Sequence, residues 1–202
     1  GLLERLDDRL RLLRSAQRAG EGRHSALQAA LDWSHQLLSA DEQKVFRRLG
    51  AFAGSFSIES AAHCVAGTGL DVADAIDLVG RLVDRSLLGT LPGDPPRYLL
   101  SESARLYARE QLARTGELDE ARARMAAAML ERLDGAFDDY WSLDEAVWLQ
   151  RFLPDIDSVR AAIDWAAGHD GALAVALYGS SWPLYAEAEL AGEARSRFEQ
   201  NV

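Results

Sequence analysis

The chain has 202 residues, of which 48% are hydrophobic, so it can bury a core and form one or two domains. Its formal charge is −10, and the excess acid is concentrated in residues 113–202, which carry −9, whereas residues 1–24 carry +2. An acidic surface repels phosphate backbones, which argues against nucleic-acid binding by the whole chain, and Cys64 alone excludes an internal disulfide.

Neither a membrane span nor a signal peptide is expected. The sequence has no run of about 18 apolar residues, and its charged, amphipathic N-terminus does not resemble a secretion signal. A single cysteine fits a reducing compartment, so we expect a cytoplasmic protein with no membrane partner. Because the chain begins at Gly1 without a methionine and ends within a helical pattern, we expect both ends to continue in a longer parent protein.

The first quarter of the chain predicts helices that are separated by polar connectors. Residues 2–14 and 25–38 carry leucines at helical spacing. Ser39 and Glu42 form a capping-box pattern, which predicts a further helix that starts at the next residue. Residues 50–56 are too rich in glycine for a helix and predict a short strand or turn.

Two helices and a hairpin are expected next. Ser57 predicts the cap of a helix that runs to about Val65, and residues 72–85 predict another helix. Segments 87–91 and 97–101 predict strands joined by a proline-rich loop. The stripe of helix 72–85 that is expected to face the core comprises Val72, Ile76, Val79 and Val83, widened by Leu78 and Leu82.

From residue 102 onward the pattern is helical. Ser142 to Glu145 form a second capping-box pattern. Helices followed by a hairpin have the order of a winged helix, and antiparallel helices with short joints are typical of a repeat array. We therefore expect a mainly α fold: a winged helix-turn-helix with a small β-hairpin wing, followed by an antiparallel α-helical (TPR-like) array. The expected later helices are 102–114, 117–140, 143–152, 155–167, 170–187 and 190–202.

The sequence lacks the patterns of catalytic and metal sites. The only lysine, Lys44, lies in a predicted helix, so the chain has no phosphate-binding loop. The four histidines are scattered, and His63 and Cys64 point about 100° apart on a helix, which does not suit one metal ion. We expect no enzyme activity, no metal and no cofactor in this chain.

Helix 72–85 is where a winged helix would read DNA. Carboxylates that face phosphates lower affinity, so nucleic acid is not expected as a partner of this segment. A DNA-binding winged helix remains one alternative, and a free-standing helical scaffold is another. The charged residues of this helix and its caps are Asp71, Asp74, Asp77, Asp84, Arg81 and Arg85.

The last helices contain aromatic residues that suit either a core or a ligand site. At helical spacing, aromatic residues usually pack between stacked helices, so we expect these to be core. If the concave face of the array binds a partner, Trp182 and Tyr185 are the residues predicted to contact it. The aromatic residues in question are Trp141, Trp148, Trp165, Trp182 and Tyr185.

Residues 27–56 contain, in order, an Ala-Leu-x-Trp-Ser motif, Leu-Leu, a glutamate, Phe-Arg-Arg-Leu and Phe-x-Gly-x-Phe. Further motifs lie at 82–88, 98–108, 156–165 and 192–194. This succession resembles the region after the ATPase module in bacterial STAND-class regulators, which are related to the NB-ARC proteins. The matching residues of the first segment are Ala30, Leu31, Trp33, Ser34, Leu37, Leu38, Glu42, Phe46, Arg47, Arg48, Leu49, Phe52, Gly54 and Phe56.

The resemblance implies a non-catalytic regulatory and sensor role in a nucleotide-switched transcriptional regulator. ATP or ADP would bind the parent protein, and the winged helix would act as a lid on the ATPase module of the same chain. Residues 1–24 would end the ATPase-associated helical module, residues 25–114 would be the winged helix, and residues 115–202 would begin the helical repeats. These repeats would bind an unknown protein or small-molecule signal.

The resemblance also implies one nucleotide contact. NB-ARC relatives carry Met-His-Asp after the wing, where the histidine touches the ADP phosphate, and this chain has Leu100, Ser101 and Glu102 there. A serine can donate a hydrogen bond but brings no positive charge. Ser101 and Glu102 are therefore candidate nucleotide contacts, and the alternative is that Ser101 caps helix 102–114.

Overall fold

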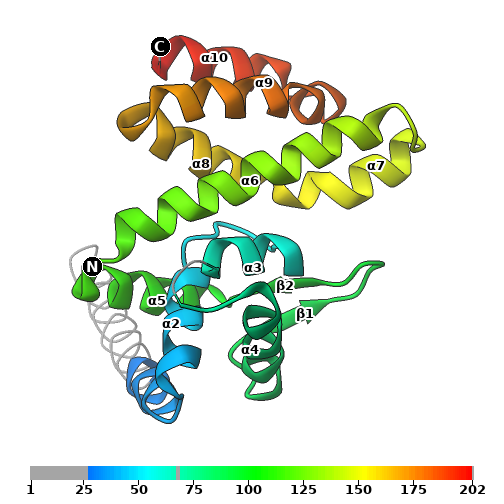
Figure 1. Ribbon diagram of the computed structural model, residues 1–202. Helices are drawn as coiled ribbons and strands as arrows, with labels where there is room; N and C mark the ends of the chain where they lie inside the picture. Colours follow the sequence, from blue (N-terminus) through cyan, green and yellow to red (C-terminus); the bar gives the residue numbers. More distant parts are fainter. Residues whose placement is uncertain (1–26, 67–68, 202) are drawn as a thin grey trace, which may run out of the picture. The chain divides into compact units, whose positions relative to one another are not determined.

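The computed structural model describes residues 27–66 and 69–201. The chain divides into two units, Gly1–Ser39 and Ala40–Val202. In the first unit residues 27–36 are helical, as predicted, whereas the helix predicted at 2–14 and its connector lie outside the described residues. The second unit is mainly helical and its described residues hold one two-stranded antiparallel sheet (Figure 1).

Residues 40–99 form the part that we call the helix–hairpin segment. The predicted hairpin is confirmed with shorter strands, in which Gly89 lies opposite Leu99. The predicted turn at 50–56 is also confirmed, and its last residue, Phe56, forms an isolated antiparallel bridge with Tyr98. The elements are α2 (Ala40–Leu49), α3 (Ile58–Val65), α4 (Val72–Asp84), β1 (Gly89–Leu91) and β2 (Arg97–Leu99).

The buried face of α4 differs from the predicted stripe. Val72 and Ile76 are 47% and 42% exposed, so their assignment to the core is wrong. The helix packs against α2 and α3 through a face rotated away from these two residues. Its buried residues are Ala75, Leu78, Val79 and Leu82.

The Leu82–Leu88 motif makes the turn from α4 into the hairpin. Ser86 adopts a left-handed conformation with φ of 60°, and the amides of Leu87 and Leu88 donate to the Leu82 carbonyl at 3.0 and 3.2 Å. The two leucines then enter the core. Arg85 forms an ion pair of 3.3 Å with Glu42, a buried residue of α2.

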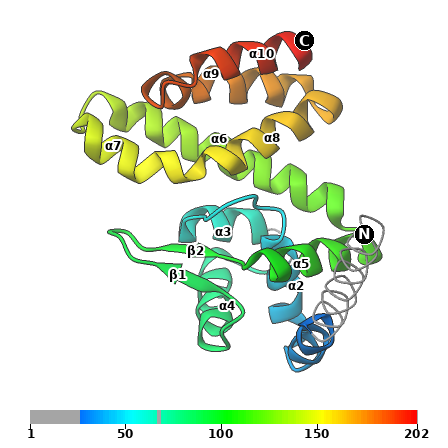
Figure 2. The same cartoon turned by 180° about the vertical axis from the view of Figure 1, so that it is seen from behind.

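Helix α5 (Glu102–Thr115) leads to residues 118–201, which we call the helical array. Figure 2 shows α8 crossing in front of α6, with α9 above them, and α6 also packs against α3. The predicted helix boundaries are close to those observed. The elements of the array are α6 (Leu118–Tyr140), α7 (Glu145–Phe152), the 3₁₀ turn η1 (Leu153–Asp155), α8 (Ile156–His169), α9 (Gly171–Glu187) and α10 (Ala191–Asn201).

The second predicted capping box is wrong. The Ser142 hydroxyl donates to the Asp139 carbonyl at 3.1 Å, so it satisfies the end of α6 instead of starting α7. The N-cap of α7 is Asp144, whose carboxylate accepts from the Ala146 amide at 3.0 Å. The domain boundaries predicted at 24/25 and 114/115 stay predictions.

The aromatic residues of the array divide into core and surface. The core interpretation is confirmed for Trp148 and Tyr185, which are each 1% exposed. It is wrong for Trp141 and Trp182, which are 79% and 55% exposed. Trp148 is fixed further because its indole N–H donates to the Ala136 carbonyl at 2.7 Å.

Within residues 27–66 and 69–201, no helix combines the length and apolar character needed to cross a bilayer.

Gly50 provides a test of the packing between α2 and α5. A Cβ atom there would lie 2.6 Å from the Ala108 Cβ and 2.9 Å from the Arg47 carbonyl oxygen. We expect Gly50→Ala to lower the free energy of unfolding by about 1–3 kcal/mol, because the added methyl overpacks this contact. Guanidinium unfolding followed by circular dichroism measures the change.

The matched control is Gly80→Ala in α4, where a Cβ would meet nothing within 4 Å. Alanine favours the helix by up to about 1 kcal/mol over glycine, so this variant should be more stable than the parent chain. Equal effects of the two substitutions would contradict the close contact at Gly50.

Candidate functional site

Two polar clusters and one turn connect the helix–hairpin segment to the helical array, and we call this region the junction. The first cluster joins α2 and α3 to the start of α6. The second centres on Asp155 and joins the hairpin to α6 and η1. The turn is residues 50–56, between α2 and α3.

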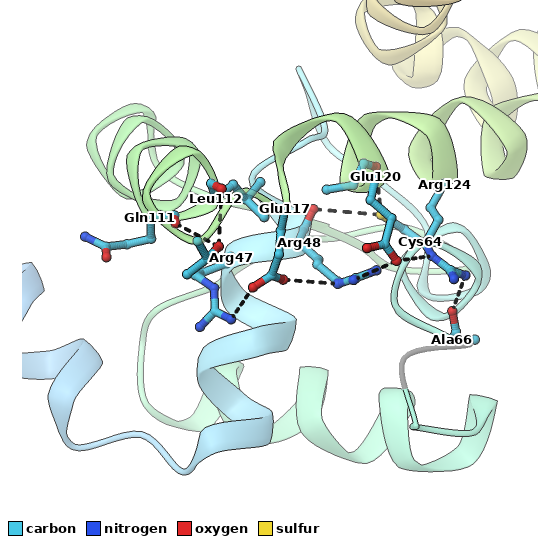
Figure 3. Close-up of polar contacts among 11 residues, drawn as sticks. Arg47, Arg48, Cys64, Ala66, Gln111, Leu112, Glu117, Glu120 and Arg124 are labelled. Atoms are coloured by element: carbon cyan, nitrogen blue, oxygen red, sulfur yellow. Dashed lines mark hydrogen bonds and ion pairs between the residues drawn. The ribbon is translucent and has the colours of Figure 1, made fainter. Parts of the chain in front are cut away.

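The first cluster is built on the Phe-Arg-Arg-Leu motif (Figure 3). Arg47 pairs with Glu117 at 2.9 Å, and Arg48 pairs with Glu120 at 3.0 Å and with Glu117 at 3.7 Å. The arginines lie in the last turn of α2 and the glutamates at the start of α6. Each charge therefore opposes the partial charge at its own helix end, which adds to the pairing. The Arg48 side chain is 3% exposed, so the carboxylates are needed to offset the cost of burying its positive charge.

Arg124 extends this cluster to the end of α3. Its Nη1 donates to the Ala66 carbonyl at 2.6 Å, and its Nε donates to Glu120 at 3.2 Å. The carbonyl at a helix end has no partner within the helix, so this arginine satisfies a backbone group that would otherwise be open. Three helices are thereby held at one point.

The arginines lower the pKa of both glutamates. For Glu120, the hydrogen bonds from Arg48 and Arg124 hold the pKa of the carboxyl below its usual value. For Glu117, burial alone would raise the pKa, but the Arg47 hydrogen bond and nearby charges outweigh it. Both carboxylates therefore keep their charge to a lower pH than a free glutamate does.

Cys64 lies buried beside this cluster. Its sulfur is 3.8 Å from the Arg48 carbonyl oxygen and 3.9 Å from the Ala121 carbonyl oxygen. Burial raises the pKa of the thiol to about 12. Because the thiolate is the reactive form, this buried thiol is suited to packing and poorly suited to nucleophilic chemistry.

The second cluster places one carboxylate between two arginines. Asp155 is 1% exposed; it pairs with Arg97 of β2 and accepts from the Arg132 Nε of α6 at 3.1 Å. Arg97 also donates to the side chain and carbonyl of Ser55, at 3.0 and 2.8 Å. One buried charge thus holds the hairpin, the turn, α6 and η1 together.

The turn at 50–56 depends on side chains from other elements for its backbone hydrogen bonds. Arg109 of α5 donates to the Gly50 carbonyl at 2.8 Å, and Arg105 donates to the Ala53 carbonyl. The Ser158 hydroxyl of α8 accepts from the amides of Ala53 and Gly54 at 3.2 and 3.4 Å. Buried backbone groups need partners, so the turn keeps its shape only while α5 and α8 are in place.

A third set of ion pairs lies farther along the array. Glu193 of α10 accepts from the Nε and Nη2 of Arg160 in α8, at 2.7 and 2.5 Å, and from Arg197 at 2.8 Å. The hydrogen bond from Arg160 is the main reason that the pKa of Glu193 is lowered. Arg160 and Glu193 lie in two of the motif segments, 156–165 and 192–194, and the structure brings them into contact.

The predicted site residues lie in two places. The Ser101 hydroxyl accepts from the Ala104 amide at 3.2 Å, so Ser101 is the N-cap of α5, and Glu102 follows it on the surface. Trp182 and Tyr185 share α9, but only Trp182 is accessible. Burial raises the pKa of Tyr185 to about 12. The nucleotide role of Ser101 and Glu102 and the partner role of Trp182 and Tyr185 stay predictions.

Among residues 27–66 and 69–201, no group of three His, Cys, Asp or Glu side chains could hold a metal ion.

Relatives from Mycobacterium tuberculosis (strain ATCC 25618 / H37Rv) and from Mycobacterium bovis carry the name "Putative HTH-type transcriptional regulator". Each is 37% identical over 166 residues, which cover 80% of this chain and 18% of the relative. An "Uncharacterized protein" of M. tuberculosis is 34% identical over 128 residues, covering 61% of this chain and 32% of that protein. The chain thus spans about a fifth of the length of the HTH-type relatives.

No protein-family model matches the sequence, and no solved structure matches it.

The Asp155 cluster predicts that removing one negative charge lowers the stability of the protein strongly. Asp155→Asn leaves Arg97 and Arg132 without their shared carboxylate, so we expect the free energy of unfolding to fall by about 3 kcal/mol or more. Chemical denaturation measures this. Asp157→Asn is the matched control, because its pair with Arg160 is on the surface, with Asp157 61% exposed, and such pairs contribute at most about 1 kcal/mol. Equal losses would contradict the role of Asp155.

The lowered pKa of Glu193 predicts a stability effect that depends on pH. A carboxyl whose folded pKa lies below its unfolded value contributes stability above the unfolded pKa, which is about 4.3. That contribution disappears as the pH falls through the folded pKa. Glu193→Gln should therefore be less stable than the parent chain at pH 7, and the gap should narrow at pH 3. Denaturant midpoints at both pH values give the comparison, and a gap that widens in acid would contradict the assignment.

Proposed function

We propose that this chain is the winged helix and the first part of a TPR-like array of a STAND-class, nucleotide-switched transcriptional regulator. The observation that carries the proposal is that the family-like motifs have distinct structural tasks, one at the junction and one at the turn from α4 into the hairpin. The Phe-Arg-Arg-Leu motif holds the start of α6, and the Leu82–Leu88 motif makes the turn into the hairpin. The names of the HTH-type relatives support a regulatory role.

In this proposal the helix–hairpin segment covers the ATPase module of the same parent chain. The solvent side of α4 carries exposed Val72 and Ile76 beside Asp74 and Asp77. Apolar residues among carboxylates suit a protein surface and do not suit the phosphates of DNA. ATP or ADP binds the parent protein in the cytoplasm, and the chain itself has no enzyme activity and no cofactor. Ser101 and Glu102 face solvent at the start of α5, where a nucleotide could reach them.

The junction supports a coupling role. Arg48 and Asp155 are nearly inaccessible charges that each pair across it, Arg48 with Glu120 of α6 and Asp155 with Arg97 of β2. Separating the helix–hairpin segment from the array would break the pairs of Arg48 with its glutamates and leave Asp155 with Arg132 alone, which is costly for charges that are buried while the two parts are joined. A protein or small-molecule signal that binds the array would therefore move the lid with it. Trp182 is the accessible aromatic residue of α9 for such a partner.

DNA binding by α4 is the second candidate, because two relatives are named HTH-type regulators. These relatives are much longer than the chain, so their helix-turn-helix can lie elsewhere. Electrophoretic mobility shift at 50 mM salt separates the candidates. We expect no shifted band, and a band that weakens as salt rises would favour DNA binding.

The lid proposal predicts an effect of Ile76→Glu in the parent protein that contains the ATPase module. A charge on the apolar part of α4 should weaken the lid, so release of bound ADP should become faster, as measured with a fluorescent ADP analogue. Val175→Glu in α9, at a residue 62% exposed, is the matched control and should leave ADP release unchanged.

The isolated 202-residue chain should bind neither ATP nor ADP in calorimetry. Micromolar binding there, or an unchanged release rate for Ile76→Glu, would contradict the proposal.

A further inference from the structure

A groove of about 590 Å³ lies between the hairpin loop and α7. Its apolar walls include Leu91 and Val147, which are 41% and 50% exposed, and Leu143. Its polar lining includes Arg97, Arg132 and Arg151. This volume lies within the range of small-molecule sites, and the lining combines apolar and charged residues.

Arg132 is held in a fixed position at this groove. Its Nε donates to Asp155 at 3.1 Å, and its Nη2 donates to the Arg151 carbonyl at 3.0 Å. Its guanidinium carbon also lies 4.4 Å from the centre of the Phe152 ring. These contacts leave the Nη1 group without a hydrogen-bond partner among the described residues. A prepositioned donor of this kind loses little freedom when it binds an acceptor.

The charges around the groove favour an anion. Arg97, Arg132 and Arg151 line the groove, whereas the carboxylates that pair with them, Asp155 and Asp139, do not line it, so the lining offers more hydrogen-bond donors than acceptors to a ligand. Arg151 pairs with Asp139 at 3.0 Å, but both side chains are partly exposed, and such surface pairs exchange partners easily. Asp94 at the hairpin loop is the acidic residue that lines the groove itself.

We propose that this groove binds a small aliphatic carboxylate. The carboxylate accepts hydrogen bonds from the Arg132 Nη1 and from Arg151, and the aliphatic chain packs against Leu91 and Val147. The ligand then contacts the hairpin and α7 at once, next to the Asp155 cluster, and reinforces the junction. This site lies outside the nucleotide switch proposed above, and it binds or fails to bind in the isolated chain whether or not that switch exists.

The test is a titration of the ¹⁵N-labelled 202-residue chain followed by amide chemical shifts. The probes are octanoate, 1-octanol and octylamine, which share an eight-carbon chain and differ in head group. We expect saturable shifts with octanoate at residues 91–97 and 143–151. The affinities for 1-octanol and octylamine should be lower than that for octanoate by about tenfold or more. Octanol that binds as tightly as octanoate, or octanoate without saturable shifts in this region, would overturn the proposal.

Variants assign the head-group contacts. Arg151→Gln should weaken octanoate about tenfold through the loss of a charged donor, and Val147→Glu should abolish binding through repulsion. Arg132→Gln should also weaken octanoate binding about tenfold, provided that its melting temperature shows that it folds. If it does not fold, Arg151→Gln and Val147→Glu test the site, because neither residue contacts Asp155. Arg195→Gln, which removes a surface pair on α10, is the matched control and should bind normally. Normal binding by both Arg151→Gln and Val147→Glu would refute the site.

A peptide distinguishes a free ligand from a protein segment. Acetyl-Leu-Glu-Leu-Glu-amide carries carboxylates beside aliphatic side chains, as a partner protein would. We expect it to bind more weakly than octanoate. Tighter binding of the peptide, with the same loss in Arg151→Gln, would replace the small-molecule assignment by a protein partner.

Discussion

The buried carboxylate of Asp155 is the contact on which the arrangement of the second unit depends. A lone charge at 1% exposure would be strongly unfavourable, so its cost is offset only while Arg97 and Arg132 are both present. These arginines come from β2 and α6, and the first also holds the Ser55 backbone. The hairpin, the turn and the array can therefore keep their native contacts only together.

The turn at 50–56 and the cluster on α2 repeat this logic with different chemistry. In the turn the groups at risk are backbone amides and carbonyls, and their partners are side chains of α5 and α8. In the α2 cluster the group at risk is Arg48, and its partners are carboxylates of α6. Each of these sites penalises separation of the helix–hairpin segment from the array. A regulator in which one part senses and another part covers a nucleotide module would need this property.

Local signals predicted most of the elements, because caps and helical periodicity act within a few residues. Ser57 and Ser101 both cap the helices expected to follow them. The exposure of Val72 and Ile76 could not be predicted, since two overlapping faces of helix 72–85 are apolar and only packing against α2 and α3 selects one. Asp155 could not be identified either: it is one of 32 acidic residues, and its partners lie 58 and 23 positions away. The motif Phe-Arg-Arg-Leu did mark Arg48, but nothing in the sequence pointed to its glutamates.

Every cation at the junction is an arginine, and the chain has only one lysine, Lys44. A guanidinium stays protonated far above physiological pH and is not a substrate for acetylation at an amine. Lysine acetylation, the commonest enzymatic way to neutralise a positive charge, therefore cannot act on the junction. Alkali does not loosen it either, so the carboxylates are the side of these pairs that ordinary changes of pH can neutralise. The ion pairs of the junction are therefore constant, and regulation of the protein must act on the surfaces around them.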